Sequence, residues 1–326
     1  MFPAGLVIAL HCSGAGAGQW RSLGELLGSE FPLAAPEHYG CDRSGSWSGT
    51  HAFSLADEAV RTIELIDRGM ERIHLVGHSY GGGVALHVAL MRPHRIASLS
   101  LYEPSAFHLL RQMGDRGRDG FAEIAAVARA TGECILCGDH AAAAKLFVDY
   151  WGGRGAWATM RPSVQSDLIR WAPKAPLDFR ALIEEPTAIE AYSQLRMPTL
   201  VIRGEHAPLP TGALAEELPS LMPCVRTSVI PGAGHMGPMT HVSAVNELIA
   251  AHIRTSAAAD RVSESAQPAS NVPDGDGLRA NPIAATGRNY DMASRSVPSA
   301  LAASGHGERQ SDAGRDRADR YGSCNA

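Results

Sequence analysis

Residues 72–87 read RIHLVGHSYGGGVALH, and this stretch decides the fold. Its apolar beginning, residues 73–76, has the length and composition of a strand that is buried on both faces. A turn of the pattern G-x-S-x-G follows, and the apolar sequence beyond it predicts a helix that Pro93 stops. The turn is so tight that its flanking positions require glycine, and it leaves the hydroxyl of Ser79 exposed above the sheet. We therefore interpret Ser79 as a nucleophile.

The composition limits the kinds of partner that the chain can have. Of its 326 residues, 45% are apolar and 19% are charged, and the net charge is -5. This apolar share is sufficient for a large core, and the small negative charge argues against nucleic acid and anionic membranes as partners. We expect a small-molecule substrate, and the sequence leaves the oligomeric state open.

The cysteines show no disulfide framework, since the six of them are scattered along the chain: Cys12, Cys41, Cys134, Cys137, Cys224 and Cys324. Two of them make a C-x-x-C pair in Ala-rich helical sequence, but a typical zinc site needs a second pair. We expect no metal site here, and free thiols fit a reducing cytoplasm.

The apolar N-terminus, MFPAGLVIALHC, is typical of a strand rather than of an export signal. No Lys or Arg precedes the apolar run, and His11 stands where a lipoprotein signal needs a small residue. No segment of the chain reaches the roughly eighteen apolar residues of a membrane span.

Strands and helices alternate along most of the chain. Short apolar runs predict six strands, over residues 2–10, 31–35, 73–76, 96–102, 199–203 and 225–230. Helical patterns follow them, and alternation of this kind predicts a mostly parallel sheet with helices on both faces. The expected fold class is thus α/β with about six strands.

The strand signal disappears between residues 105 and 194, where the sequence is Ala-rich and helical in pattern. An insertion between two strands of one sheet has to lie on the rim of that sheet, so we expect a helical cap above Ser79. Most of its aromatic side chains should form the cap's own core, while one or two of Tyr150, Trp151 and Trp157 are candidates to face the substrate pocket.

The predicted core then comprises residues 1–104 and 195–255, with the cap at residues 105–194. From residue 256 to residue 326 the sequence is rich in Ala, Ser, Gly, Asp and Arg, with few large apolar side chains. Such a segment cannot offset its ordering entropy by burial, so we predict a disordered tail.

A serine hydroxyl needs a base to take its proton. Our candidate is His235, which lies between glycines in GAGHMG after the last predicted strand. His78, His11 and His241 are the alternatives. His78 should point away from its neighbour Ser79, and His11 more plausibly braces the glycine-rich loop that follows the first strand.

The motifs HCSGAGAGQW, GHSYGG and GAGHMGP occur in this order, and with them the chain resembles the α/β-hydrolase family over about residues 5 to 255. The resemblance implies Ser79 as nucleophile and His235 as base. It also implies an oxyanion hole formed by the backbone N–H groups of Ser13 and Tyr80. Preorganised donors of this kind typically contribute a few kcal/mol each to transition-state binding.

The catalytic acid departs from the family pattern. The family usually has an Asp three residues beyond the glycine that ends the strand before the last, and that position is Ala207 here. Alanine cannot orient an imidazole. Certain family members carry the acid one strand earlier, which points to Glu103, with Glu205 as a second candidate and a helix-capping role as the structural alternative for Glu103.

The N-terminus also departs from the family pattern. Family members usually have an antiparallel hairpin before their first parallel strand, whereas here Met1 lies almost at the start of that strand. The strand at residues 31–35 would then be an exposed edge, which is an aggregation hazard. We expect either a true start further upstream or a partner that covers this edge.

These features predict a cofactor-free serine hydrolase that cleaves a small ester-like or other acyl substrate through an acyl-serine intermediate. The same serine site could also serve carbon-carbon bond hydrolysis or peracid formation. The rival hypothesis is a catalytically weak or inactive ligand-binding protein of the same fold, which the alanine at position 207 and the short start favour.

Overall fold

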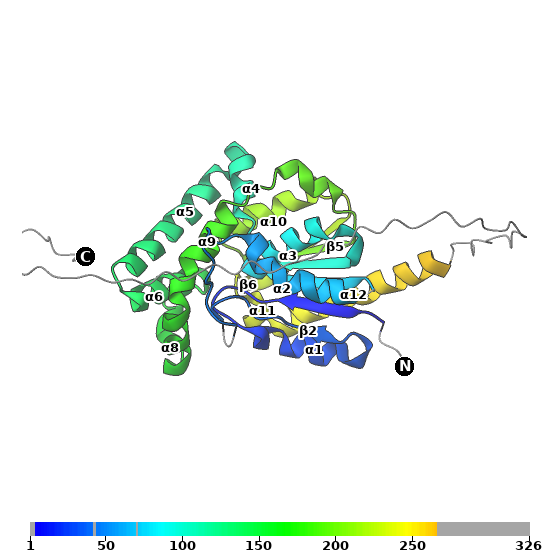
Figure 1. Cartoon of the computed structure of the whole chain (residues 1–326), viewed down its shortest axis with the longest axis horizontal. Helices are drawn as coiled ribbons and strands as arrows, with labels where there is room; N and C mark the ends of the chain where they lie inside the picture. Colours follow the sequence, from blue (N-terminus) through cyan, green and yellow to red (C-terminus); the bar gives the residue numbers. More distant parts are fainter. Residues whose placement is uncertain (1–3, 42–43, 70, 266–326) are drawn as a thin grey trace, which may run out of the picture. The chain divides into compact units, whose positions relative to one another are not determined.

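The structure, a computed structural model, describes residues 4–41, 44–69 and 71–265 (Figure 1). In this part of the chain one six-stranded parallel sheet has the order β2-β1-β3-β4-β5-β6. The strands are β1 (Leu6–Leu10), β2 (Leu33–Ala34), β3 (Ile73–His78), β4 (Ile96–Tyr102), β5 (Thr199–His206) and β6 (Val225–Gly234). The predicted α/β fold with about six mostly parallel strands is confirmed.

Helices cover both faces of the sheet because successive side chains of a strand point to opposite faces. In β1, Ile8 and Leu10 belong to one buried cluster, whereas Val7 and Ala9 belong to another. The first cluster includes side chains of α2, α3 and α10, and the second includes side chains of α1 and α12. The bounds of these helices, and of the short α11, are α1 (Arg21–Leu27), α2 (Leu55–Arg68), α3 (Tyr80–Met91), α10 (Leu209–Leu221), α11 (Gly237–Thr240) and α12 (Val242–Ser265).

The tight turn between β3 and α3 depends on glycine. A Cβ on Gly77 would lie 2.5 Å from the carbonyl oxygen of Gly81, and a Cβ on Gly81 would lie 2.4 Å from that of Leu10. Both distances are shorter than real Cβ contacts, so glycine at both positions lets the backbone fold back on itself. The turn thereby brings the start of α3 against the end of β1.

Between β4 and β5 the chain is helical, as predicted, and we call residues 105–194 the cap. Its α-helices are α4 (Phe107–Gln112), α5 (Asp115–Leu136), α6 (His140–Trp151), α7 (Ala156–Thr159), α8 (Pro162–Trp171) and α9 (Ala175–Ile183). Helices α5, α6, α8 and α9 lie together in Figure 1. Part of the cap forms a separate buried cluster, which contains Val148, Leu168 and Trp171 together with Cys41 of the core.

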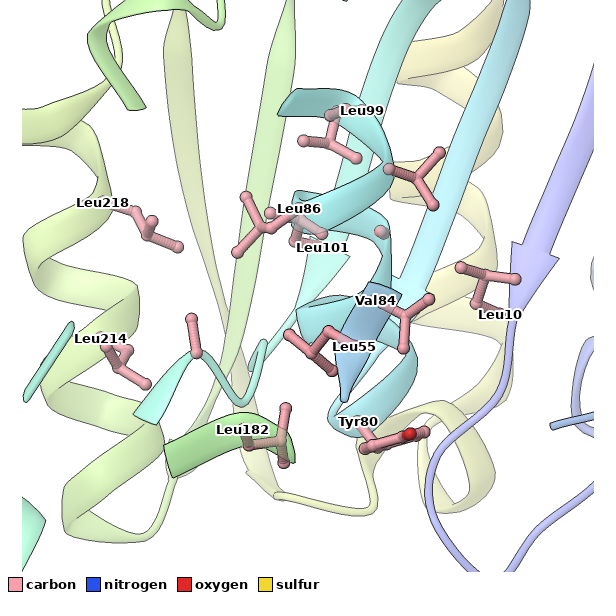
Figure 2. Close-up of a cluster of buried hydrophobic side chains, with 14 of the residues drawn as sticks. Leu10, Leu55, Tyr80, Val84, Leu86, Leu99, Leu101, Leu182, Leu214 and Leu218 are labelled. Atoms are coloured by element: carbon pink, nitrogen blue, oxygen red, sulfur yellow. The ribbon is translucent and has the colours of Figure 1, made fainter. Parts of the chain in front are cut away.

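The cap also packs against the core beneath it. Leu182 of α9 joins the cluster that contains Val84 of α3 and Leu214 of α10, and Figure 2 shows these side chains together with Tyr80. Because Gly83 has no side chain, the cap can approach α3 closely: a Cβ there would lie 2.6 Å from Leu182 Cδ2.

The predicted start of the tail at residue 256 is wrong, because α12 continues to Ser265. Alanine favours helix, Ala257 is buried in the second cluster, and Arg72 forms an ion pair with Asp260 at 2.9 Å. The remainder of the predicted tail, residues 266–326, lies outside the described residues.

The edge strand β2 is only two residues long, from Leu33 to Ala34, and pairs with β1 alone in the described part of the sheet. A very short edge strand offers few free backbone groups to another chain. The aggregation hazard expected for residues 31–35 is therefore smaller than the sequence indicated. None of the helices in the described ranges combines the length and the apolar character that crossing a membrane requires.

Candidate active site

Three side chains from distant parts of the sequence meet at the carboxyl ends of the parallel strands. Ser79 follows β3, Glu103 follows β4, and His235 follows β6. The register pairs His78 of β3 with Tyr102 of β4, so Ser79 and Glu103 leave the sheet at the same level. All three side chains are buried, with exposed fractions of 6% for Ser79, 0% for Glu103 and 2% for His235.

Hydrogen bonds connect these three residues in one line. The Ser79 Oγ lies 2.8 Å from His235 Nε2, and His235 Nδ1 lies 2.7 Å from Glu103 Oε2. Because a carboxylate only accepts, Nδ1 carries the proton and Nε2 is left to accept from the serine hydroxyl. The sequence-based candidates for nucleophile, base and acid are thus in the geometry that a Ser-His-acid arrangement needs.

Backbone strain is concentrated at two of these residues. Among the described residues, only Ser79 and Glu103 have a positive φ without being glycine, at 55° and 40°. Such conformations cost of order 1–3 kcal/mol each and persist where the surrounding structure imposes them. At Ser79 the strain follows from the tight turn after β3, which presents the hydroxyl to the imidazole of His235.

The Glu103 carboxylate has three hydrogen-bond donors. Besides His235, the backbone N–H of Gly204 donates to Oε1 at 2.9 Å, and the Thr211 hydroxyl donates to Oε2 at 2.8 Å. The Glu103 side chain therefore bonds to groups of β5 and α10. It does not serve as the N-cap of α4, the first helix of the inserted cap. Bonds to both carboxylate oxygens fix the plane of the group and so the orientation of the imidazole.

The second acid candidate lies elsewhere. Glu205 Oε2 accepts a hydrogen bond from the exposed backbone N–H of Gly232 at 2.8 Å. Ala207, at the family's usual acid position, comes just after the end of β5 at His206. Of the two candidates, only Glu103 contacts the imidazole of His235.

The other candidate histidines have different partners. His78 Nε2 donates to the backbone carbonyl of His235 at 2.9 Å, and the Gln19 side chain donates to its Nδ1 at 3.1 Å. Burial, with a smaller contribution from His235, holds the pKa of His78 well below its usual value. His78 thus stays neutral and supports the loop that carries His235.

His11 and His241 are also bound away from Ser79. His11 Nε2 lies 3.1 Å from Glu37 Oε2, beside the glycine-rich loop, and His241 Nδ1 lies 2.9 Å from the hydroxyl of its neighbour Thr240. Burial, followed by the charge of His38, lowers the pKa of His11. His235 is the one of the four candidates that contacts Ser79.

A cavity of about 170 Å³ opens beside Ser79 and His235. Its lining is mainly apolar and comes from the first loop, the cap and the segment after His235: Cys12, Ser13, Gly14, Ala15, Phe147, Val148, Trp151, Gly152, Met160, Val164, Leu168, Met236 and Met239. Burial raises the pKa of the Cys12 thiol to about 12, so this thiol is not a competing nucleophile at neutral pH.

Of the three cap aromatics that the sequence proposed for the pocket, Trp151 lines the cavity and packs against the imidazole of His235. Its ring centroid lies 4.2 Å from that of His235. The Tyr150 hydroxyl instead donates to Glu123 at 2.7 Å, and Trp157 packs against the cap's own cluster.

A second space, of only about 10 Å³, is also lined by Ser79. Such a volume holds about one water-sized group. Ser13 and Tyr80, the expected sources of the oxyanion hole, both line it together with Asp178. Tyr80 is the first residue of α3, and the first N–H groups of a helix have no partner within the helix.

Sequence reasoning missed several residues around the site. Thr211 holds Glu103, the Ser105 hydroxyl lies 3.3 Å from the Ser79 hydroxyl, and Asp178 accepts a hydrogen bond from the Ser13 hydroxyl at 2.6 Å. Ser105 lies three residues beyond the end of the predicted strand 96–102 and could have been noticed. The other two come from distant helices, and no motif marks them.

No group of three or more metal-binding side chains is found in the described part of the chain. Cys134 lies in α5 and Cys137 is the residue that ends it, and neither is bonded to another cysteine.

Comparisons with known proteins agree with this geometry at the level of the fold. A family model described as "alpha/beta hydrolase fold" matches residues 5–242. The 2-hydroxy-6-oxo-6-phenylhexa-2,4-dienoate hydrolase of Burkholderia cepacia is 26% identical over 253 residues, which are 74% of this chain and 85% of that protein. A crystal structure of a hydrolase from Pseudomonas aeruginosa PA01 is 22% identical, with a TM-score of 0.60 over 76% of this chain and 89% of that one.

A relative of much greater length matches as well. The polyketide synthase ThaQ of Burkholderia thailandensis is 29% identical over 224 residues, or 66% of this chain. The matched segment is 10% of that synthase, so the chain spans about a tenth of the length of this curated relative.

Proposed function

The chain belongs to the alpha/beta hydrolase family, and from this premise we propose that it is a cofactor-free serine hydrolase that cleaves a small ester-like or other acyl substrate. The observation that carries the proposal is the continuous line of hydrogen bonds from Glu103 through His235 to Ser79, at 2.7 and 2.8 Å. A protein that only binds a ligand has no need to bury a serine, a histidine and a glutamate that are hydrogen-bonded in this order. The cytoplasmic location expected from the unpaired cysteines remains a prediction.

The reaction proceeds in two halves. His235 Nε2 takes the proton of the Ser79 hydroxyl as its oxygen attacks the substrate carbonyl, and the Ser13 and Tyr80 N–H groups donate to the resulting oxyanion. The imidazolium, which Glu103 orients and stabilises, then gives its proton to the leaving group, and an acyl-serine remains. In the second half His235 takes a proton from water, whose oxygen attacks the acyl carbonyl, and returns it to Ser79.

The cavity favours a neutral, apolar substrate. The relative from Burkholderia cepacia is named for a dienoate, which carries a carboxylate. No lysine or arginine is among the described residues that line either space beside Ser79, and Asp178 lines the smaller one. A buried carboxylate without a cationic partner costs several kcal/mol. We therefore propose that this chain does not share the relative's charged substrate.

The alternative is a ligand-binding protein with weak or no activity. The alanine at position 207 is the observation that favours it, since the family's usual acid is missing there. Glu103 supplies a carboxylate to the same imidazole from another strand, and this removes the main reason for the alternative.

Hydrolysis of two 4-nitrophenyl esters tests the proposal. We expect turnover of 4-nitrophenyl butyrate that Ser79→Ala abolishes, and a kcat/KM at least about tenfold lower for 4-nitrophenyl hemisuccinate, because its carboxylate finds no cation in the apolar cavity. Equal kcat/KM for the two esters would contradict the assignment of a neutral substrate. Tight binding of the butyrate ester by folded wild-type protein without turnover would favour the ligand-binding protein.

A further inference from the structure

A buried group of three charged side chains joins the cap to the core next to the active site. Lys174, at the end of a short helical turn before α9, is 6% exposed; Asp178 of α9 is 4% exposed and Glu58 of α2 is 3% exposed. Lys174 Nζ lies 3.0 Å from Glu58 Oε2 and also donates to Asp178 Oδ1. We call these three residues the Lys174 cluster.

Two hydroxyl groups of the active site donate into the Lys174 cluster. The Ser13 hydroxyl donates to Asp178 Oδ2 at 2.6 Å, and the Tyr80 hydroxyl donates to Glu58 Oε2 at 2.8 Å. Ser13 and Tyr80 are the two residues whose backbone N–H groups form the proposed oxyanion hole. The side chains of both donors are therefore anchored to the same buried ammonium group, each through one carboxylate.

Lys174 and Glu58 favour their charged forms although they are buried. Burial by itself would lower the pKa of Lys174, but Asp178 and Glu58 outweigh it and raise that pKa. Burial would raise the pKa of Glu58, but His38 and Lys174 together lower it, and Tyr39 donates its backbone N–H to the same carboxylate at 2.9 Å. Burial raises the pKa of Asp178, against the opposing charge of Lys174.

A buried ionic group of this kind is weak evidence for stability, because apolar side chains of similar volume often stabilise a fold as well or better. Its geometry instead suggests a role in specifying positions. An oxyanion hole works only if its donors lie about 2.7–3.1 Å from the developing charge, and a misplacement of about 1 Å can cost on the order of a hundredfold in rate.

We propose that the Lys174 cluster positions the oxyanion hole, with Lys174 and Asp178 of the cap acting through the Ser13 and Tyr80 side chains on the two backbone N–H groups. This inference rests on the proposed function for its catalytic consequence. It makes Lys174, Asp178 and Glu58 positioning residues. It also means that the hole is complete only when the cap is seated, which links cap docking to catalysis.

Removal of the two hydroxyl groups tests the proposal without touching the N–H groups. For Tyr80→Phe and Ser13→Ala we expect kcat on 4-nitrophenyl butyrate to fall about tenfold, with KM within about twofold, because the hole binds the transition state and not the ester. Lys174→Met should lower kcat further, and Lys174→Arg should restore part of it. The matched controls are Tyr192→Phe and Ser98→Ala, since both remove a buried hydroxyl that is hydrogen-bonded to a histidine outside the site.

Hydrogen exchange gives a reading that does not depend on activity. In Tyr80→Phe, Ser13→Ala and Lys174→Met we expect faster amide exchange over residues 11–16 and 79–82, with wild-type exchange over the β5 and β6 strands. If wild-type protein hydrolyses no ester but the variants still loosen these two segments, the proposed function fails and the positioning role stands. Two results would overturn the positioning role: amide exchange in these variants that is as slow as in wild type over both segments, or variants of an active enzyme with a raised KM and an unchanged kcat. The cluster would then only hold the cap on the core.

Discussion

At the scale of single residues, the proposed triad takes its carboxylate from Glu103, because the family's usual acid position is Ala207. The sequence motifs predicted Ser79 as nucleophile and His235 as base. Glu103 was predicted as the acid only because certain family members carry their acid at that strand, and Glu205 remained a second candidate. The structure brings Glu103 Oε2 to 2.7 Å from His235 Nδ1, whereas Glu205 binds the backbone of Gly232. No pattern in the sequence marks Thr211, because its contact with Glu103 joins an α10 side chain to the end of β4.

Glu103→Gln should lower kcat on 4-nitrophenyl butyrate about 1,000-fold or more, with the fold preserved. The amide keeps the shape of the side chain, but it no longer stabilises the imidazolium and it favours the wrong imidazole tautomer. Steady-state kinetics measure the effect, and Glu205→Gln is the matched control with near wild-type kcat. A large loss in Glu205→Gln and none in Glu103→Gln would transfer the role of the acid to Glu205.

At the scale of elements, the strands were predictable and the contacts between distant elements were not. Each strand is a short apolar run, and the turn after β3 carries its glycines in the sequence. The end of the core was misplaced, because the Ala-rich composition from residue 256 onward fits a helix as well as a tail, and α12 continues to Ser265.

The turn between β3 and α3 makes a prediction about stability. Gly81→Ala should destabilise the protein by about 1–3 kcal/mol or more, because the new Cβ would lie 2.4 Å from the Leu10 carbonyl oxygen and backbone has to move. Gly18→Ala is the control, since a Cβ there meets nothing within 4 Å. Urea unfolding of both variants compares the free energies of unfolding. Equal values would contradict the close approach of the turn to β1.

At the scale of the whole molecule, the core is large but contains ionisable groups that the sequence could not place. His74 of β3 is 2% exposed, with Nδ1 at 2.8 Å from the Ser98 hydroxyl. Burial, helped by His252 and Arg72, lowers the pKa of His74 to about 4. From the sequence alone, a histidine within an apolar run is indistinguishable from any other strand residue. Only the packing around His74 shows that its imidazole is kept neutral. The same limit applies to Ser13 and Asp178, which form a hydrogen bond although they are 165 residues apart in the sequence.

The buried His74 predicts how stability changes with pH. The folded state keeps its imidazole neutral, whereas the unfolded chain protonates it near its ordinary pKa of 6.5. Protons therefore favour unfolding: the contribution of His74 is fully present above about pH 6.5 and is lost as the pH falls toward about 4. The loss at about pH 4 is about 3 kcal/mol.

Urea unfolding at pH 7 and at pH 4.5 measures this contribution. His74→Gln, which keeps a hydrogen-bonding side chain but does not titrate, should show a smaller fall in the free energy of unfolding than wild type. His94→Gln is the control because His94 is exposed. An identical fall in wild type and His74→Gln would show that His74 does not contribute to the acid sensitivity.

The central claim is that Ser79, activated by His235, is the nucleophile, and covalent labelling by a fluorophosphonate with intact-mass detection tests it most directly. We predict one adduct on wild-type protein, no adduct on Ser79→Ala and much slower labelling of His235→Ala. Ser105→Ala distinguishes the two neighbouring hydroxyls, which lie 3.3 Å apart, and should still take up one adduct. An adduct that persists in Ser79→Ala, or folded wild-type protein that takes up none, would contradict the account.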